Sequence, residues 1–157
     1  VIYLNSPKKL ENFAYELFSK LPEKQISRLN KAASDLREYV HENYKLADYI
    51  EKGVIYHHGS ISEPIRYFIE DLYINVPEIK MLIANSTLLE GVNIPATKMF
   101  ILDPCRGSGY LSPSSFKNLI GRVCRFGEIF NNNTGDLKYL LPEIHIVKGR
   151  YCRKNFK

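Results

Sequence analysis

The sequence lacks the features that mark membrane-spanning proteins and disulfide-stabilised secreted proteins. No apolar run approaches the ~20 residues needed to cross a bilayer, and the N-terminus carries no signal-peptide pattern. The three cysteines, Cys105, Cys124 and Cys152, are odd in number and too widely spaced for a paired metal-binding motif. We therefore expect a cytoplasmic protein with reduced thiols, no membrane partner and no metal site.

Motifs that hold a nucleotide are also missing. The sequence contains no Gly-x-x-x-x-Gly-Lys-Ser/Thr loop (Walker A), which cradles phosphates, and no Asp-Glu pair after an apolar strand (Walker B), which holds magnesium. It has no Gly-x-Ser-x-Gly elbow of the kind that presents a hydrolytic serine. We therefore expect that this chain alone does not hydrolyse ATP and binds no cofactor by itself.

What is present is an ordinary globular composition with an uneven distribution of charge. The 157 residues fit one domain, with 45% hydrophobic and 25% charged residues. The last ten residues hold five of the 22 basic residues and no acid, which leaves 17 basic residues to balance 17 acidic ones. This basic tail, residues 148–157, either tracks a nucleic-acid backbone or is a solvated terminus or the start of a linker. Because the chain begins in a β-like run without an initiator methionine, we expect a piece of a longer protein.

Strand-like and helix-like stretches alternate along the sequence, which favours parallel βαβ units. The expected strands are short apolar runs, and the expected helices carry apolar residues at intervals of three and four. The helical stretch at about 23–52 is interpreted as an insertion in one crossover and not as a second domain. We predict an α/β domain over residues 1–147, with strands at 1–5, 54–58, 79–84, 98–103 and 143–147.

The most informative short stretch is Asn-Leu-Ile-Gly-Arg-Val-Cys-Arg at residues 118–125. On a helix that begins near Pro113, an apolar stripe falls on one side, and Asn118, Arg122 and Arg125 fall on the other. Arginine keeps its charge at any working pH, and its forked donors match phosphate oxygens. Two rigidly held guanidiniums suit a phosphate whose charge changes during a reaction. A solvated basic helix face is the alternative.

A second polar stretch follows the apolar run 79–84. Thr87 and Glu90 match a capping box, so a helical turn is expected at the carboxyl end of a strand, where ligands of open α/β sheets collect. Gly91 then ends the turn and leaves Asn93 on an irregular loop. The alternative is a capped turn that only reverses the chain.

Two further pairs of residues receive structural interpretations. His57 and His58 are adjacent on an expected strand, so they point to opposite faces and do not share a metal ion. Arg66 and Glu70 are spaced i,i+4 on an expected helix, which is typical of a surface ion pair of small value.

Taken in order, these stretches resemble the second RecA-like lobe of a superfamily-two helicase, closest to the superkiller-like branch, with the DEAD/DEAH-box proteins more distant. Residues 2–6 resemble motif IV, and residues 53–59, with the arginine and glutamate that follow, resemble the next segment of that branch. Residues 86–96 resemble motif V, and residues 118–125 resemble motif VI. The resemblance covers most of residues 1–127. It implies a RecA-like fold of the P-loop NTPase type, a three-layer α/β sandwich with a mainly parallel central sheet.

The resemblance also implies three groups of site residues: catalytic arginine fingers, ATP-binding residues and nucleic-acid-binding residues. The fingers would stabilise charge on the γ-phosphate of ATP held mainly by the missing first lobe, so ATP and Mg²⁺ are expected in the full-length protein. The implied partners are nucleic acid, either DNA or RNA, and the N-terminal RecA-like lobe of the same protein. The groups are Arg122 and Arg125 for catalysis, Gly91, Asn93 and Asn118 for ATP, and Thr87, Asn5 and Ser6 for nucleic acid.

Three functions are compatible with these observations. The first is the C-terminal lobe of an ATP-dependent helicase or translocase. The second is a nucleic-acid-binding or partner-docking lobe of a degenerate, non-hydrolysing helicase-like protein, which is favoured by two departures from the family pattern: Asn118 for the usual Gln and Cys124 for a usual Gly. The third is an unrelated α/β enzyme that acts on a small phosphorylated substrate.

Overall fold

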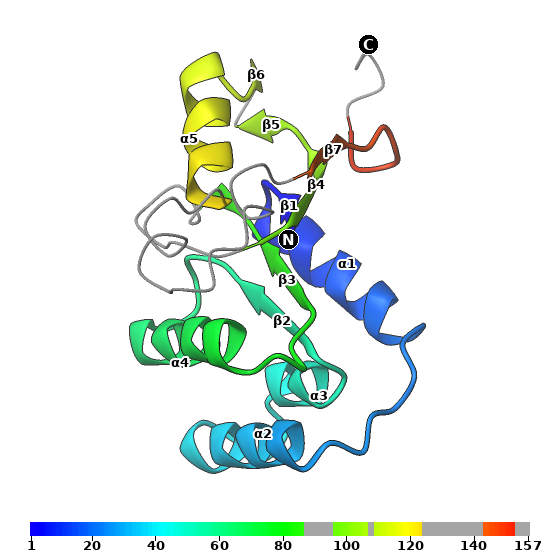
Figure 1. Ribbon diagram of the computed structural model, residues 1–157, viewed down its shortest axis with the longest axis vertical. Coiled ribbons are helices and arrows are strands. Elements are labelled where there is room, and N and C mark those ends of the chain that lie inside the picture. Colours follow the sequence, from blue (N-terminus) through cyan, green and yellow to red (C-terminus); the bar gives the residue numbers. More distant parts are fainter. Residues whose placement is uncertain (87–95, 107–108, 124–142, 153–157) are drawn as a thin grey trace, which may run out of the picture.

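The computed structural model describes residues 1–86, 96–106, 109–123 and 143–152. Its centre is a five-stranded sheet with the strand order β2-β3-β1-β4-β7, in which all neighbouring strands are parallel (Figure 1). Each of the five predicted runs contains one of these strands. The strands are β1 (Ile2–Leu4), β2 (Val54–His57), β3 (Met81–Ala84), β4 (Lys98–Asp103) and β7 (Glu143–Ile146).

Strands β1, β2 and β3 are buried on both of their faces. Tyr3 and Leu4 of β1 are completely buried, and so are Ile55 of β2 and Ile83 of β3. Parallel sheets normally have both faces covered, which is why their strands read as continuous apolar runs. Because the strands are parallel, their carboxyl ends all lie at one edge of the sheet, which we call the carboxyl edge.

Helices form a layer on each face of the sheet. α1 (Pro7–Phe18) packs on one face, where Leu10 is completely buried. α4 (Glu63–Asn75) and α5 (Pro113–Val123) lie on the opposite face, where Leu119 is part of the larger hydrophobic core (Figure 1). The predicted fold class is therefore confirmed: this is an α/β fold with helices on both sides of a mainly parallel sheet, as in a RecA-like lobe.

Two helices form within the predicted insertion at residues 23–52. α2 (Ser27–Tyr39) and α3 (Lys45–Glu51) pack against each other, and α3 contacts β2, which is the edge strand of the sheet. The turn after α3 contains Gly53, whose φ of 72° is a left-handed conformation. A Cβ atom at this position would lie 2.5 Å from the carbonyl oxygen of Glu78, so only glycine fits.

A small antiparallel pair of strands follows the end of β4. β5 (Cys105–Arg106) pairs with β6 (Gly109–Tyr110), and residues 107–108 lie outside the described residues. From the two glycines, the sequence predicts only a turn at residues 107–109. The strands on either side are too short to produce a detectable pattern.

The described part of the basic tail packs on α1. The rings of Tyr151 and Phe13 meet edge to face, with their centroids 5.8 Å apart. Lys9 Nζ donates a hydrogen bond to the carbonyl oxygen of Tyr151 at 3.1 Å, and Arg150 forms an ion pair with Glu16. Tyr151 is therefore held against the helix, whereas residues 148–150 are exposed. The position of the domain boundary stays a prediction.

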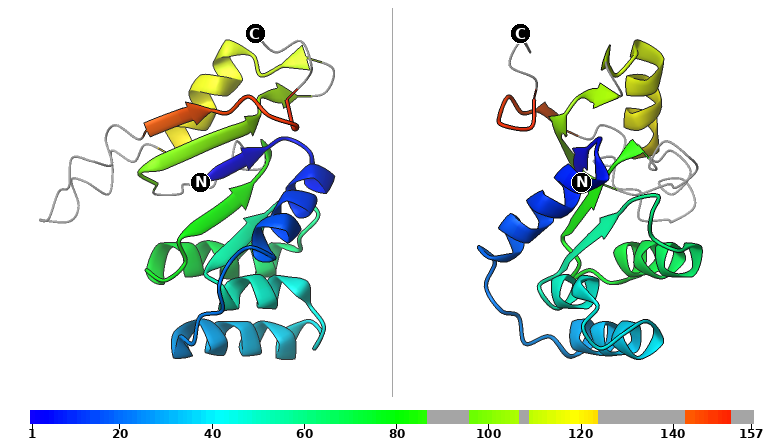
Figure 2. Two further views of the ribbon diagram at one scale, coloured as in Figure 1. Left: turned by 90° about the vertical axis from the view of Figure 1, so that its right-hand side faces the viewer. Right: turned by 180° about the vertical axis from the view of Figure 1, so that it is seen from behind.

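Views from two other directions show the same layers (Figure 2). The sheet separates α1 from α4 and α5, and α2 and α3 lie beyond the β2 edge. Within the described ranges, no helix combines the length and the apolar character that crossing a membrane requires.

Candidate nucleotide and nucleic-acid sites

The carboxyl edge of the sheet brings together polar residues that follow different strands. Asn5 and Ser6 follow β1 and are partly exposed, whereas Asn85 follows β3 and is buried. Ser6 occupies the N-cap position of α1, but its hydroxyl makes no capping hydrogen bond. N–H groups at a helix start also attract anions. The surroundings of Asn5 and Ser6 are therefore suitable for a contact with a phosphate.

α5 has the two-sided character that the sequence predicts. The Ser112 hydroxyl accepts a hydrogen bond from the N–H of Ser115 at 3.1 Å, which caps the start of the helix. Leu119 is completely buried, whereas Asn118 is exposed and Arg122 is partly exposed. Asn118 and Arg122 are one helical turn apart and lie on the same side. The packed side of α5 therefore fixes the direction in which its polar side faces.

Arg122 has no ion-pair partner among the described residues. Most arginines with described side chains are neutralised: Arg28, Arg37 and Arg150 each pair with at least one carboxylate. In this part of the chain, only Arg66 and Arg122 have no such pair. A guanidinium that is partly exposed, unpaired and carried on a packed helix is available to an anionic ligand. This observation favours a ligand-binding role over a merely solvated helix face.

The structure places the described site residues in two different regions. The N–H of Leu111 donates to the carbonyl oxygen of Pro104 at 2.8 Å, which ties the start of α5 to the end of β4. From there α5 runs back along its face of the sheet (Figure 1), so Arg122 lies about 14 Å along the helix from its first residue. Asn5 and Ser6 lie at the carboxyl edge instead. This separation fits the different ligands predicted for the two groups, ATP for the α5 residues and nucleic acid for Asn5 and Ser6.

Four other predicted site residues, Arg125, Thr87, Gly91 and Asn93, lie outside the described residues.

A buried pair of a histidine and a glutamate at the carboxyl edge was not predicted. His57 is completely buried at the end of β2, and its Nε2 lies 2.8 Å from Oε1 of Glu70 on α4. The expected surface ion pair between Glu70 and Arg66 is therefore wrong, since Glu70 pairs with His57. A buried ring nitrogen without a partner costs more free energy than a lost surface ion pair, which explains the choice. The i,i+4 spacing was the only signal in the sequence, and it carries no information about the strand.

Arg66 is left with an unusual environment by this arrangement. It lies in the first turn of α4, next to the carboxyl edge, and the side chain as a whole is partly exposed. Its Nε atom is buried and has no hydrogen-bond partner among the described residues. Arg66 is therefore a candidate binding residue that the sequence motifs did not identify.

His58 points to the opposite face of the sheet from His57, as predicted for neighbours on a strand. Its Nε2 lies 3.1 Å from Oε1 of Glu11 on α1, an ion-pair distance without hydrogen-bond alignment. The ring of His58 stacks on Tyr56, with centroids 5.7 Å apart. The structure brings no group of three or more potential metal ligands together among the residues it describes.

The two histidines are expected to make stability depend on pH. Burial lowers the pKa of His57 and of His58 below the usual 6.5, although Glu70 and Glu11 oppose this effect. As the pH falls below about 6.5, the unfolded chain therefore takes up protons that the folded chain does not. We expect the free energy of unfolding to decrease by up to about 1.4 kcal/mol per pH unit for each histidine.

Urea unfolding of the chain between pH 7.5 and pH 5 measures this dependence. His57→Gln is expected to reduce the slope below pH 6.5, whereas His41→Gln, at an exposed position, is expected to leave it unchanged. An unchanged slope in His57→Gln would contradict the assignment.

Comparison with known proteins relates the chain to helicases. No protein-family model matches it. The chain is 33% identical over 131 residues to the ATP-dependent DNA helicase Hel308 of Thermoplasma volcanium, which covers 81% of the chain and 18% of that protein. It is 31% identical over 114 residues to Hel308 of Pyrococcus horikoshii, covering 70% of the chain and 16% of that protein. It is 30% identical over 135 residues to the POLQ-like helicase of Caenorhabditis elegans, covering 81% of the chain and 14% of that protein.

The chain spans less than a fifth of the length of each of these relatives, so the similarity concerns one segment of a larger protein. The predicted relation to helicases is confirmed at this level, whereas the branch within the superfamily and the individual site residues stay predictions. By sequence, the homologues of this chain include Hel308 and POLQ-like helicases.

Proposed function

We propose that the chain is the C-terminal lobe of an ATP-dependent DNA helicase or translocase of the superkiller-like branch. In this proposal Arg122 and Arg125 are arginine fingers that act on ATP held by an N-terminal RecA-like lobe. The main support is Arg122, whose guanidinium has no ion-pair partner among the described residues and lies on the polar side of a helix whose other side is buried in the core. A finger must be rigid before ATP arrives, because catalysis of phosphoryl transfer depends on positioning and charge.

The nucleic-acid surface of this lobe is assigned to the carboxyl edge. Asn5 and Ser6 follow β1, and Arg66 lies in the first turn of α4, the helix after β2; β3 lies between these two strands. Adjacent strands are about 4.8 Å apart, so the two groups are separated by roughly 10 Å. Thr87, which follows β3 in the sequence, completes this surface in our proposal.

Movement of the two lobes links the two sites. ATP and Mg²⁺ would bind mainly to the N-terminal lobe. The arginine fingers would then draw the C-terminal lobe toward the N-terminal lobe. Closure would then shift the carboxyl edge relative to the nucleic acid, and hydrolysis would reverse the shift. The residues of this chain contribute the γ-phosphate contacts from α5 and the backbone contacts from the carboxyl edge. We propose the cytoplasm as its location.

The alternative is a lobe that binds nucleic acid or a partner in a protein that does not hydrolyse ATP. The exposed Asn118 in place of the longer Gln is the observation that favours it. This alternative predicts DNA binding that depends on salt but not on ATP, because no closure couples the two sites.

Binding of single-stranded DNA to the full-length protein separates the two proposals. We expect a non-hydrolysable ATP analogue to change the affinity about fivefold or more, within the usual range of coupling between sites. Arg66→Ala is expected to weaken binding and to lower the salt dependence by about one phosphate contact. Arg28→Ala is the matched control, because Arg28 is exposed and paired with Glu78. If the analogue does not change the affinity for DNA, the non-hydrolysing alternative is favoured. If Arg66→Ala binds DNA as tightly as the wild type, Arg66 is not part of the nucleic-acid surface.

A further inference from the structure

The face of the sheet that carries α1 is only half covered by the described residues. α1 lies over β1, β2 and β3, whereas no described helix lies over β4 and β7 (Figure 2). On this side Phe100 of β4 and Val147, just after β7, are each 37% exposed. The ring of His145 stacks on Phe100, with centroids 4.8 Å apart, and is exposed as well. Parallel sheets are normally covered on both faces, so this half of the face is unusual.

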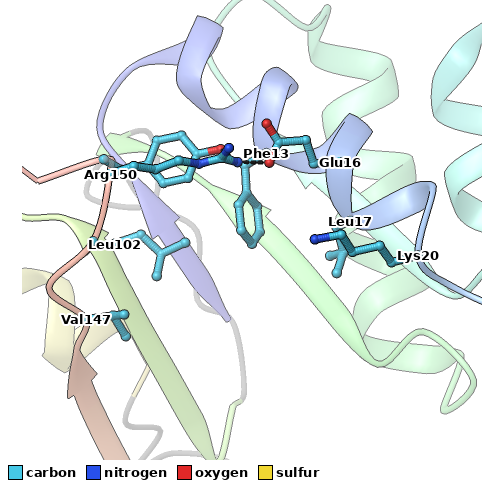
Figure 3. Close-up of a pocket in the computed structure, with 9 residues that line it drawn as sticks. Phe13, Glu16, Leu17, Lys20, Leu102, Val147 and Arg150 are labelled. Carbon is cyan, nitrogen blue, oxygen red and sulfur yellow. Dashed lines mark hydrogen bonds and ion pairs between the residues drawn. The ribbon is translucent and has the colours of Figure 1, made fainter.

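A pocket of about 280 Å³ lies between α1 and the uncovered strands (Figure 3). Leu102 and Val147 line it from the sheet, and Phe13 and Leu17 line it from α1. Arg150 reaches across one end to its ion-pair partner on α1, as Figure 3 shows. The pocket is therefore a largely apolar groove between a helix and a sheet, and tail residues 149–151 close one end of it.

The dimensions of the uncovered strip match one helix. Two neighbouring strands span about 10 Å, which is also the diameter of an α-helix with its side chains. The described chain already covers the rest of this face with one helix, α1. A second helix beside α1 would complete the layer and would place its side chains in the groove.

The charges at the rim of the groove indicate what kind of helix fits. Glu16 is neutralised by Arg150, and Glu143 is neutralised by Lys98 at 3.0 Å. Lys20 lines the pocket, and Lys148 lies between two residues that line it; both are exposed and have no acidic partner among the described residues. The net charge of the rim is therefore positive, and it complements an acidic surface.

We propose that this groove docks an amphipathic helix of a partner segment that carries an aliphatic ridge and acidic residues along its flank. The ridge would fill the pocket formed by Leu102, Val147 and Phe13, and the acidic flank would lie beside Lys20 and Lys148. This inference concerns a different surface from the proposed ATP and DNA sites and does not depend on them.

Two synthetic helical peptides test the proposal. Both have about 14 residues, which is about 21 Å of helix and enough to follow β4. They share one leucine ridge, and their flanks carry either glutamate or lysine. Fluorescence anisotropy with the full chain is expected to show about tenfold or tighter binding of the glutamate peptide.

Substitutions in the groove define the binding surface. Val147→Glu is expected to weaken binding of the glutamate peptide about tenfold or more, whereas Ile74→Glu, at a 46% exposed position on α4, leaves it within about twofold. Reversing both rim charges, Lys20→Glu with Lys148→Glu, is expected to invert the preference between the peptides. This second variant alters only exposed residues, so it keeps the test decisive if Val147→Glu does not fold.

Several results would overturn the proposal. They are no binding of the glutamate peptide, equal binding of both peptides, or equal losses in Val147→Glu and Ile74→Glu. A dimer in sedimentation that Val147→Glu abolishes would also overturn it, because the groove would then hold a second copy of the chain.

Discussion

Replacing Arg122 by alanine in the full-length protein is expected to lower kcat for ATP hydrolysis about 10³-fold, as is usual for the loss of an arginine finger. The physical reason is that charge grows on the transferred phosphoryl group, and a preorganised guanidinium stabilises it without reorganisation. Arg125→Ala is expected to have a similar effect. Because the finger acts mainly in the transition state, KM for ATP should change much less than kcat.

Two variants control this measurement. Lys117→Ala removes an exposed cation from the same helix and is expected to leave kcat unchanged. Arg122→Lys keeps the charge but loses the forked donors, and we expect most of the activity to be lost as well. Turnover of Arg122→Ala near the wild-type value, with the fold intact, would refute the finger assignment. DNA affinity without nucleotide serves as a check that the lobe remains folded.

The second large effect is expected at the ion pair between Lys9 and Asp103. Asp103 ends β4 with its side chain 2% exposed, and its Oδ2 lies 2.7 Å from Nζ of Lys9. Its other oxygen is buried and has no hydrogen-bond partner among the described residues. Removal of the lysine would leave a buried carboxylate without a cation. We therefore expect Lys9→Met to lower the free energy of unfolding by about 2 to 3 kcal/mol, less than for a fully buried pair because Lys9 is partly exposed.

Urea unfolding of the chain at pH 7.5 measures this effect. Lys8→Met is the matched control, because Lys8 is exposed and neighbours Lys9 on the same helix. Adding Asp103→Asn to Lys9→Met is expected to recover part of the loss, since it removes the unpaired charge. A loss below about 0.5 kcal/mol in Lys9→Met would show that the pair behaves as a surface pair.

The elements of the fold were largely predictable because their signals are local. Each predicted strand is a short apolar run between turn residues, and all five occur within one sheet. The helix predicted to begin near Pro113 is α5, which begins at that residue. Periodicity and capping act over a few residues, so they can be read without knowledge of the fold.

The contacts between distant residues were not predictable in the same way. The sequence gives Glu70 a partner four residues away, whereas the fold brings His57, buried in a different element, to 2.8 Å. Lys52 is a further example. Lysine is usually an exposed residue, but Lys52 is only 7% exposed, and its Nζ lies 2.9 Å from Oε1 of Glu23. Pairings of this kind depend on which elements are neighbours, which is a property of the sheet order.

Local sequence patterns are sufficient to predict the α/β class, the positions of the strands and the two-sided helix that carries Arg122. These follow from hydrophobic period and from the residues that begin and end helices. Three features depend on the tertiary structure: which arginines lack an ion pair among the described residues, where Tyr151 anchors the tail on α1, and that no described helix covers one face of β4 and β7. The reason is that burial and pairing are set by strand order and layer packing, which bring together residues far apart in the chain.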